Sequence, residues 1–120
     1  MAKKILIVED EPDLLTLAQE RLKAAGYDIL STTSSEETLK LLKTEMPDLI
    51  LLDLLLPEMQ GDVLCKKLKS DPHFKHIPII IFTASIIRVP ERIKEMGADD
   101  YILKPFEPAD LLEKIRMFIR

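Results

Sequence analysis

The stretch Asp48-Leu49-Ile50-Leu51-Leu52-Asp53-Leu54-Leu55-Leu56-Pro57 places one carboxylate, Asp53, inside an otherwise apolar run. The apolar residues before Asp53 are typical of a β-strand that is buried on both faces. A charged group among apolar neighbours needs an exposed edge, a partner or a cation. Pro57, followed by Gly61, indicates that the strand ends near Asp53. We therefore expect Asp53 to lie at the mouth of a buried strand and to face a crevice.

The composition is that of one globular domain. The chain has 120 residues, of which 47% are hydrophobic and 32% are charged. A formal net charge of -4 argues against direct nucleic-acid binding, because phosphate contacts rely on clustered Lys and Arg. No apolar run approaches the ~20 residues that cross a bilayer. We expect a single cytoplasmic domain over residues 1–120, with no membrane segment and no output domain.

Strand-like apolar runs alternate with segments of helical periodicity. Pro12 suits the first turn of a helix, Gly26 suits a helix end, and Ser34 with Glu37 forms a capping box. The predicted strands are 4–8, 27–32, the run that ends near Asp53, 78–83 and 101–103, and the predicted helices are near 12–25, 35–46, 62–70, 90–96 and 108–118. Five such units predict an α/β fold with a doubly wound parallel sheet.

Polar residues follow the predicted strands at the points where ligands bind in such folds. Ligands lie beyond the carboxyl ends of parallel strands, where the strand order reverses. Glu9 and Asp10 follow the first strand, Asp53 ends the third, Thr83 ends the fourth and Lys104 follows the fifth. We expect these five residues to share one crevice.

The chemistry of these groups predicts a phosphoryl site. Three carboxylates in one place raise each other's pKa values and need a cation, and Mg²⁺ fits because it prefers a few carboxylates together with a phosphate. Lys104 offers a compact positive charge, and the Thr83 hydroxyl can donate to a phosphate oxygen. The chain has no Gly-rich phosphate loop, so ATP is a poor candidate ligand. Asp53 is the carboxylate that could attack a phosphoryl donor and form an acyl phosphate.

The candidate site residues belong to several short motifs along the chain. They are Val8-Glu9-Asp10-Glu11-Pro12, Leu52-Asp53-Leu54-Leu55-Leu56-Pro57 with Gly61, Thr83-Ala84, Gly97-Ala98-Asp99-Asp100-Tyr101 and Lys104-Pro105-Phe106. In their order and spacing they resemble the receiver domain of two-component response regulators, and the resemblance covers the whole chain. It implies a flavodoxin-like (βα)5 fold with a five-stranded sheet in the order 2-1-3-4-5. It also implies that a sensor histidine kinase or a histidine phosphotransfer protein phosphorylates Asp53.

The resemblance further implies a metal site. Asp10, Asp53 and the backbone carbonyl of Leu55 would hold Mg²⁺ directly, and Glu9 would act largely through water. Glu9 stands where many members of the family have aspartate, a difference that keeps the charge and lengthens the side chain. The bulky Leu55 side chain, with Ser85, would flank the path of the hydrolytic water and slow the loss of the phosphoryl group.

The resemblance also implies a conformational switch. Thr83 and Lys104 would contact the phosphoryl group, Tyr101 would rotate as Thr83 moves inward, and the Lys104–Pro105 peptide bond would be cis. Partner binding would change on the surface of the fourth helix, fifth strand and fifth helix. An apolar patch beside the switch threonine could belong to that surface or simply pack the fourth helix on the sheet: Ile86, Ile87 and Val89. The partner would be a downstream protein, an output domain of a longer chain, or a second phosphorylated copy.

Two other functions remain open at this stage. An aspartate-nucleophile phosphohydrolase joins similar groups to magnesium, but its pattern has a second Asp two residues after the nucleophile, where this chain has Leu55. A receiver-like interaction domain that is never phosphorylated would not need the intact set of site residues. The favoured hypothesis is a signalling phosphoacceptor that catalyses its own phosphorylation and dephosphorylation rather than a turnover enzyme.

Overall fold

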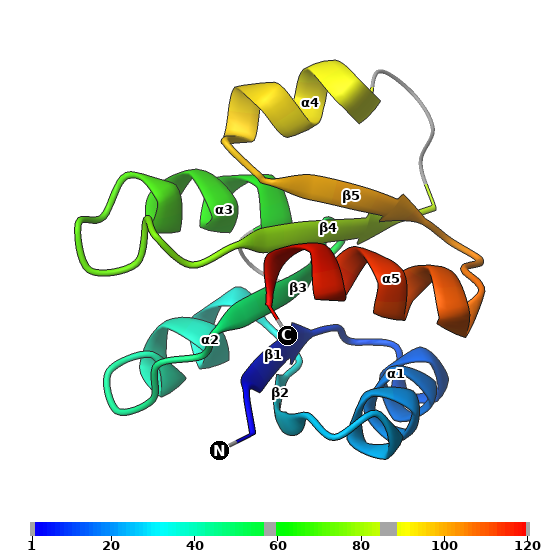
Figure 1. The fold of residues 1–120 in the computed structure, drawn as a ribbon. Helices are drawn as coiled ribbons and strands as arrows, with labels where there is room; N and C mark the ends of the chain where they lie inside the picture. The colour runs from blue at the N-terminus through cyan, green and yellow to red at the C-terminus, as the bar shows by residue number, and fades with distance from the viewer. Residues whose placement is uncertain (1, 57–59, 85–88, 120) are drawn as a thin grey trace.

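Strands and helices alternate along the whole chain. The computed structural model describes residues 2–56, 60–84 and 89–119. The elements are β1 Lys4–Val8, α1 Pro12–Ala24, β2 Asp28–Thr32, α2 Ser35–Leu41, β3 Leu49–Asp53, α3 Gly61–Lys69, β4 Ile79–Thr83, α4 Val89–Met96, β5 Asp100–Leu103 and α5 Pro108–Phe118 (Figure 1). Each strand is followed by a helix, which confirms the predicted five units.

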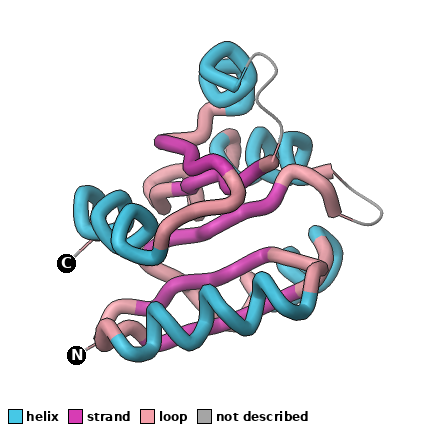
Figure 2. Tube along the Cα trace, turned by 90° about the vertical axis from the view of Figure 1, so that its right-hand side faces the viewer, coloured by secondary structure: helices cyan, strands magenta, loops and turns pink. Residues whose placement is uncertain are grey.

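The strands form one parallel sheet in the order β2-β1-β3-β4-β5. Helices lie on both faces of this twisted sheet (Figures 1 and 2). Side chains of α1 and α5 pack on one face, and those of α2, α3 and α4 pack on the other. The doubly wound architecture and the strand order predicted from the sequence are therefore confirmed.

The central strands are apolar throughout because both of their faces are covered. All residues of β3 and β4 are buried, and alternate residues of each strand enter different cores. In β3, Ile50 and Leu52 pack beneath α2 to α4, whereas Leu49 and Leu51 pack beneath α1 and α5. The polar residue Asp53 is the last residue of β3 and lies at the carboxyl end of this central strand.

Local signals in the sequence set most of the helix boundaries. Pro12 begins α1, and Gly26, at φ +97°, lies just beyond its end in a conformation that favours glycine. The Ser34 side chain accepts a hydrogen bond of 3.1 Å from the Glu37 backbone N–H at the start of α2. These features agree with the sequence-based expectations.

The second helix is shorter than predicted. We expected it to continue to Pro47, but α2 ends at Leu41 and is followed by turns stabilised by bonds from the Lys43 and Thr44 N–H groups to carbonyls three residues earlier. The tighter turns redirect the chain toward β3, and they leave Met46 48% exposed instead of on the buried face of a helix.

Candidate functional site

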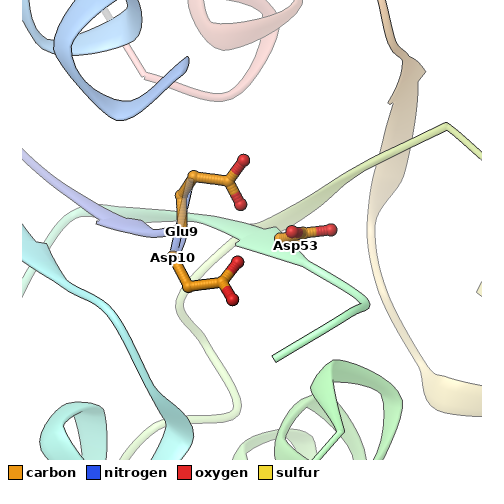
Figure 3. A group of neighbouring side chains, drawn as sticks. All are labelled: Glu9, Asp10 and Asp53. Carbon is orange, nitrogen blue, oxygen red and sulfur yellow. The ribbon is translucent and has the colours of Figure 1, made fainter. Parts of the chain in front are cut away.

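The carboxyl ends of β1, β3, β4 and β5 bring the predicted site residues to one edge of the sheet. The register pairs Val8 with Leu52, so Glu9 and Asp53 come next to each other in neighbouring strands. One carboxylate oxygen from each of Glu9, Asp10 and Asp53 lies within 4.8 Å of the other two. Figure 3 shows the three side chains together. Glu9 and Asp53 are buried and Asp10 is exposed, so the cluster opens to solvent on the Asp10 side.

Lys104 completes this cluster from the far end of the chain. Its Nζ atom lies 3.0 Å from Oε1 of Glu9, a residue 95 positions earlier in the sequence, and 3.3 Å from Oδ2 of Asp53. The Lys104 ammonium therefore offsets part of the negative charge that the three carboxylates concentrate. The proximity of Lys104, Asp10 and Asp53 on which the phosphoryl-site hypothesis depends is present in the structure.

The burial of Glu9 disfavours the charged form of its carboxyl group. Its side chain is fully buried, and among the described residues its Oε2 atom has no hydrogen-bond partner. Burial, followed by the interactions with Asp53, raises the pKa of Glu9 to about 8, although Lys104 acts in the opposite direction. Burial therefore favours the protonated form of the Glu9 carboxyl group when no cation is bound.

The raised pKa of Glu9 predicts how stability depends on pH when no divalent ion is bound. Between about 4.5 and about 8, the folded chain keeps a proton that the unfolded chain has released. The stability linked to this proton is complete below the unfolded pKa and is lost as pH rises through the folded pKa. We expect the free energy of unfolding, measured by denaturant titration with a chelator present, to decline across this window.

The matched control for that titration is Glu9→Gln. The glutamine keeps the size of the side chain and cannot release a proton, so the decline between about pH 4.5 and about pH 8 should be much weaker. Equal declines in the two proteins would assign the pH dependence to other groups.

Asp53 is held in place by the loop that follows β3. Its Oδ1 atom accepts a hydrogen bond of 3.3 Å from the Leu55 backbone N–H. The Gly61 N–H donates to the Leu54 carbonyl at 2.9 Å, and a Cβ on Gly61 would lie 2.2 Å from the Asp53 carbonyl oxygen. This close approach needs glycine, so Gly61 supports the position of Asp53 although it contributes no chemical group.

Thr83 and the turn after β5 form the opposite wall. Thr83 is 2% exposed, and its carbonyl accepts a bond of 2.8 Å from the Lys104 N–H, which ties the end of β4 to the end of β5. The bond between the Lys104 N–H and the Thr83 carbonyl fixes the point at which the Lys104 side chain leaves the sheet. The Lys104–Pro105 peptide bond is cis.

Leu55 lies in the loop after β3, and Tyr101 lies in β5. The Leu55 side chain is 72% exposed. Tyr101 is half-buried, and its ring lies under Nζ of Lys114, 5.6 Å from the centroid. Of the predicted apolar patch, Ile86 and Ile87 lie outside the described residues, and Val89 begins α4 with a side chain that is not described.

Comparison with known proteins identifies the family. The model of the response regulator receiver domain matches residues 5–116. The alkaline phosphatase synthesis transcriptional regulatory protein PhoP of Bacillus subtilis is 40% identical over 121 residues, which cover 100% of this chain and 50% of that protein. A putative response regulator from Chloroflexus aurantiacus superposes with a TM-score of 0.94 at 34% identity, with 98% of both chains covered. The chain belongs to the response regulator receiver domain family.

A second solved receiver domain bears on the acidic cluster. This domain, from a sensor histidine kinase of Pseudomonas aeruginosa, has a magnesium ion coordinated in its active-site cleft. It is 27% identical, with a TM-score of 0.90 and coverage of 99% of this chain and 98% of that one. The present receiver domain spans about half the length of the first curated relatives that it matches. In the part of the chain that the structure describes, no helix is long and apolar enough to cross a membrane.

Sequence reasoning missed two supporting residues of this receiver domain. The sequence analysis uses Gly61 as a marker for the end of the strand and as part of a family motif, but not for its close approach to Asp53, because a close backbone approach leaves no signal in one sequence. Phe82 was assigned only to the apolar core, yet Nζ of Lys104 lies 4.7 Å from the centroid of its ring. The sequence feature that could have indicated this contact is the position of the aromatic Phe82 directly before Thr83.

Proposed function

We propose that this receiver domain accepts a phosphoryl group on Asp53 from a phosphohistidine of a sensor histidine kinase or a histidine phosphotransfer protein. The observation that carries the proposal is the position of the Asp53 carboxylate, close to the carboxylates of Glu9 and Asp10 and 3.3 Å from the Lys104 ammonium. In the transfer, an Asp53 oxygen forms the new O–P bond while the P–N bond of the donor breaks. Family membership and the whole-length structural match support this assignment.

The residues present fit a magnesium ion. Asp10 and Asp53, with the Leu55 carbonyl, are proposed to bind it directly, and Glu9 through water. The buried Glu9 oxygen without a partner among the described residues and the close carboxylates support the fit, because hard oxygen ligands in small number suit Mg²⁺. A bound Mg²⁺ would neutralise the charge that develops on the transferred group.

Lys104 and Thr83 are proposed to bind the phosphoryl oxygens after transfer. A charge-assisted bond of this kind contributes about 1.5 to 3 kcal/mol, which shifts a two-state equilibrium by roughly ten- to a hundredfold. Movement of Thr83 toward the phosphoryl group would then allow Tyr101 to rotate inward. A shift of this size is sufficient to change the affinity of a surface formed by α4, β5 and α5.

A groove of about 590 Å³ between β5 and α5 supports the position of this partner surface. Apolar and aromatic residues, three acids and Lys114 line it, among them Tyr101, Leu103, Phe106, Met117, Glu107, Asp110 and Glu113. We propose that a downstream protein, an output domain joined to residues 1–120, or a second phosphorylated copy binds here. The proposal includes a single receiver domain over these residues and a cytoplasmic location.

Incubation with acetyl phosphate and Mg²⁺, followed by intact-mass measurement, tests the proposed function. A lasting gain of one phosphoryl group on Asp53, lost when Mg²⁺ is chelated beforehand, is the expected result. Rapid release of inorganic phosphate without a stable adduct would instead indicate a phosphohydrolase. No reaction with acetyl phosphate or with a phosphohistidine donor would indicate an interaction domain that is not phosphorylated.

The Leu55 side chain predicts a slow loss of the phosphoryl group. It is exposed beside Asp53 and cannot orient a water molecule for attack on the acyl phosphate. We expect Leu55→Asn to shorten the phosphoryl lifetime by roughly tenfold, because an amide can hold that water by hydrogen bonds. Decay of the adduct after removal of the donor gives the lifetime. Leu55→Met, which keeps an apolar side chain, is the control, and equal lifetimes for the wild type and Leu55→Asn would refute the role of Leu55.

A further inference from the structure

Phe82 lies directly beneath the site lysine. It is the residue before Thr83 in β4, it is 1% exposed, and it pairs with Asp53 of β3 and Ile102 of β5 in the sheet register. Nζ of Lys104 lies over its ring, 4.7 Å from the centroid. At this distance the negative face of the aromatic ring attracts an ammonium group, and burial strengthens that attraction.

The ring cannot easily move away from the lysine. Its neighbours in the sheet fix the backbone on both sides, and Phe106 packs against it edge-on, with centroids 6.4 Å apart and an interplanar angle of 66°. Phe106 follows the turn that carries Lys104. Phe82 therefore contacts both the charged end of the Lys104 side chain and the segment after it.

The ring differs in kind from the two carboxyl groups that lie beside Nζ of Lys104 among the described residues. Oxygen atoms of Glu9 and Asp53 lie 3.0 Å and 3.3 Å from Nζ, and both residues belong to the group proposed to bind Mg²⁺. A cation and a phosphoryl group at the site would alter those two ion pairs. The neutral ring face is not a metal ligand, so its attraction for the ammonium remains.

We propose that Phe82 is a positioning residue that holds the Lys104 ammonium at the carboxyl end of the sheet through a cation–π contact. This contact keeps Lys104 beside Asp53 when Glu9 and Asp53 interact with Mg²⁺. The consequence for phosphorylation rests on the proposed function. The contact itself exists without a metal or a phosphoryl group and is tested separately.

A double-mutant cycle on unfolding tests the contact. Phe82→Leu keeps an apolar side chain without an aromatic face, and Lys104→Met keeps the length of the side chain without its charge. The unfolding equilibrium constants of the wild type, both single variants and the double variant, all measured without Mg²⁺, should show a coupling of roughly three- to thirtyfold. Ile80→Val, in the same core beneath α1 and α5, should show no coupling to Lys104→Met. Absence of coupling at Phe82 would overturn the proposal.

Fluorinated phenylalanines at position 82 test positioning without a change of shape. Successive fluorine atoms weaken the negative face of the ring, so the rate of phosphorylation by acetyl phosphate and Mg²⁺ should fall stepwise, by roughly five- to thirtyfold in total. The same series at Phe74, which packs in the core beneath α2 to α4, should leave the rate unchanged. A flat series at position 82 would overturn the positioning role. If the unsubstituted protein takes up no phosphoryl group, the proposed function fails and the unfolding cycle alone decides the contact.

Discussion

Asp53→Asn is expected to lose phosphorylation, with a rate at least about a thousandfold below that of the wild type. The amide lacks the negative charge that makes the Asp53 oxygen a nucleophile. Intact-mass measurement after incubation with acetyl phosphate and Mg²⁺ gives the result, and peptide mapping of the wild type locates the adduct. Asp28→Asn, the same change at the exposed start of β2, is the control and should be phosphorylated normally. Phosphorylation of the Asp53→Asn variant would show that another residue accepts the phosphoryl group.

Asp53→Asn should also weaken the stabilisation that Mg²⁺ gives. At a free concentration a hundred times its Kd, a ligand of the folded state raises the free energy of unfolding by about 2.7 kcal/mol. Removing one of the three close carboxylates should reduce this gain to below about 1 kcal/mol at the same Mg²⁺ concentration. Thermal or denaturant unfolding with and without Mg²⁺ measures both values. An undiminished gain would show that the ion binds elsewhere.

Gly61→Ala is expected to have the largest effect on stability. The added Cβ would lie 2.2 Å from the Asp53 carbonyl oxygen and 2.8 Å from Cα of Leu54. Both are backbone atoms, so they cannot swing aside as the end of a flexible side chain could. The start of α3 or the end of β3 must shift, and we expect the free energy of unfolding to fall by about 3 kcal/mol. Because the clash is with Asp53 itself, the affinity for Mg²⁺ should fall as well.

Gly26→Ala is the matched control for that substitution. Gly26 also resists replacement, since it has φ +97°, but a Cβ there would meet nothing within 4 Å. This variant should lose about 1 to 2 kcal/mol from backbone strain and keep the Mg²⁺ affinity of the wild type. If Gly61→Ala bound Mg²⁺ as tightly as Gly26→Ala does, the approach of α3 to β3 would not control the position of Asp53.

Much of the fold could be predicted because this chain marks its boundaries with residues of restricted conformation. Pro12 and Pro108 begin helices, Gly26 follows one, and the apolar runs are long enough only for strands. The end of α2 was predicted incorrectly, because the apolar residues after Leu41 continue the helical spacing although the backbone has already turned. A periodic pattern records which residues are apolar but does not record where the chain changes direction.

The sequence also allowed us to predict which residues form the site. Parallel strands end at a common edge, so the polar residues after each apolar run had to converge there. The contacts within the site were not predictable. The isolated Oε2 atom of Glu9, the ring of Phe82 beneath Lys104 and the close approach of Gly61 all depend on side-chain and backbone distances that arise only from packing.

The bond between Glu9 and Lys104 has a consequence for the order of events during synthesis. It joins residues 95 positions apart, and the lysine follows the last strand of the sheet. A nascent chain that has not yet placed β5 has its acidic residues but lacks the amine that compensates them. We therefore expect the chain to accept a phosphoryl group only after β5 has joined the sheet. A chain that is still incomplete on the ribosome should not be phosphorylated.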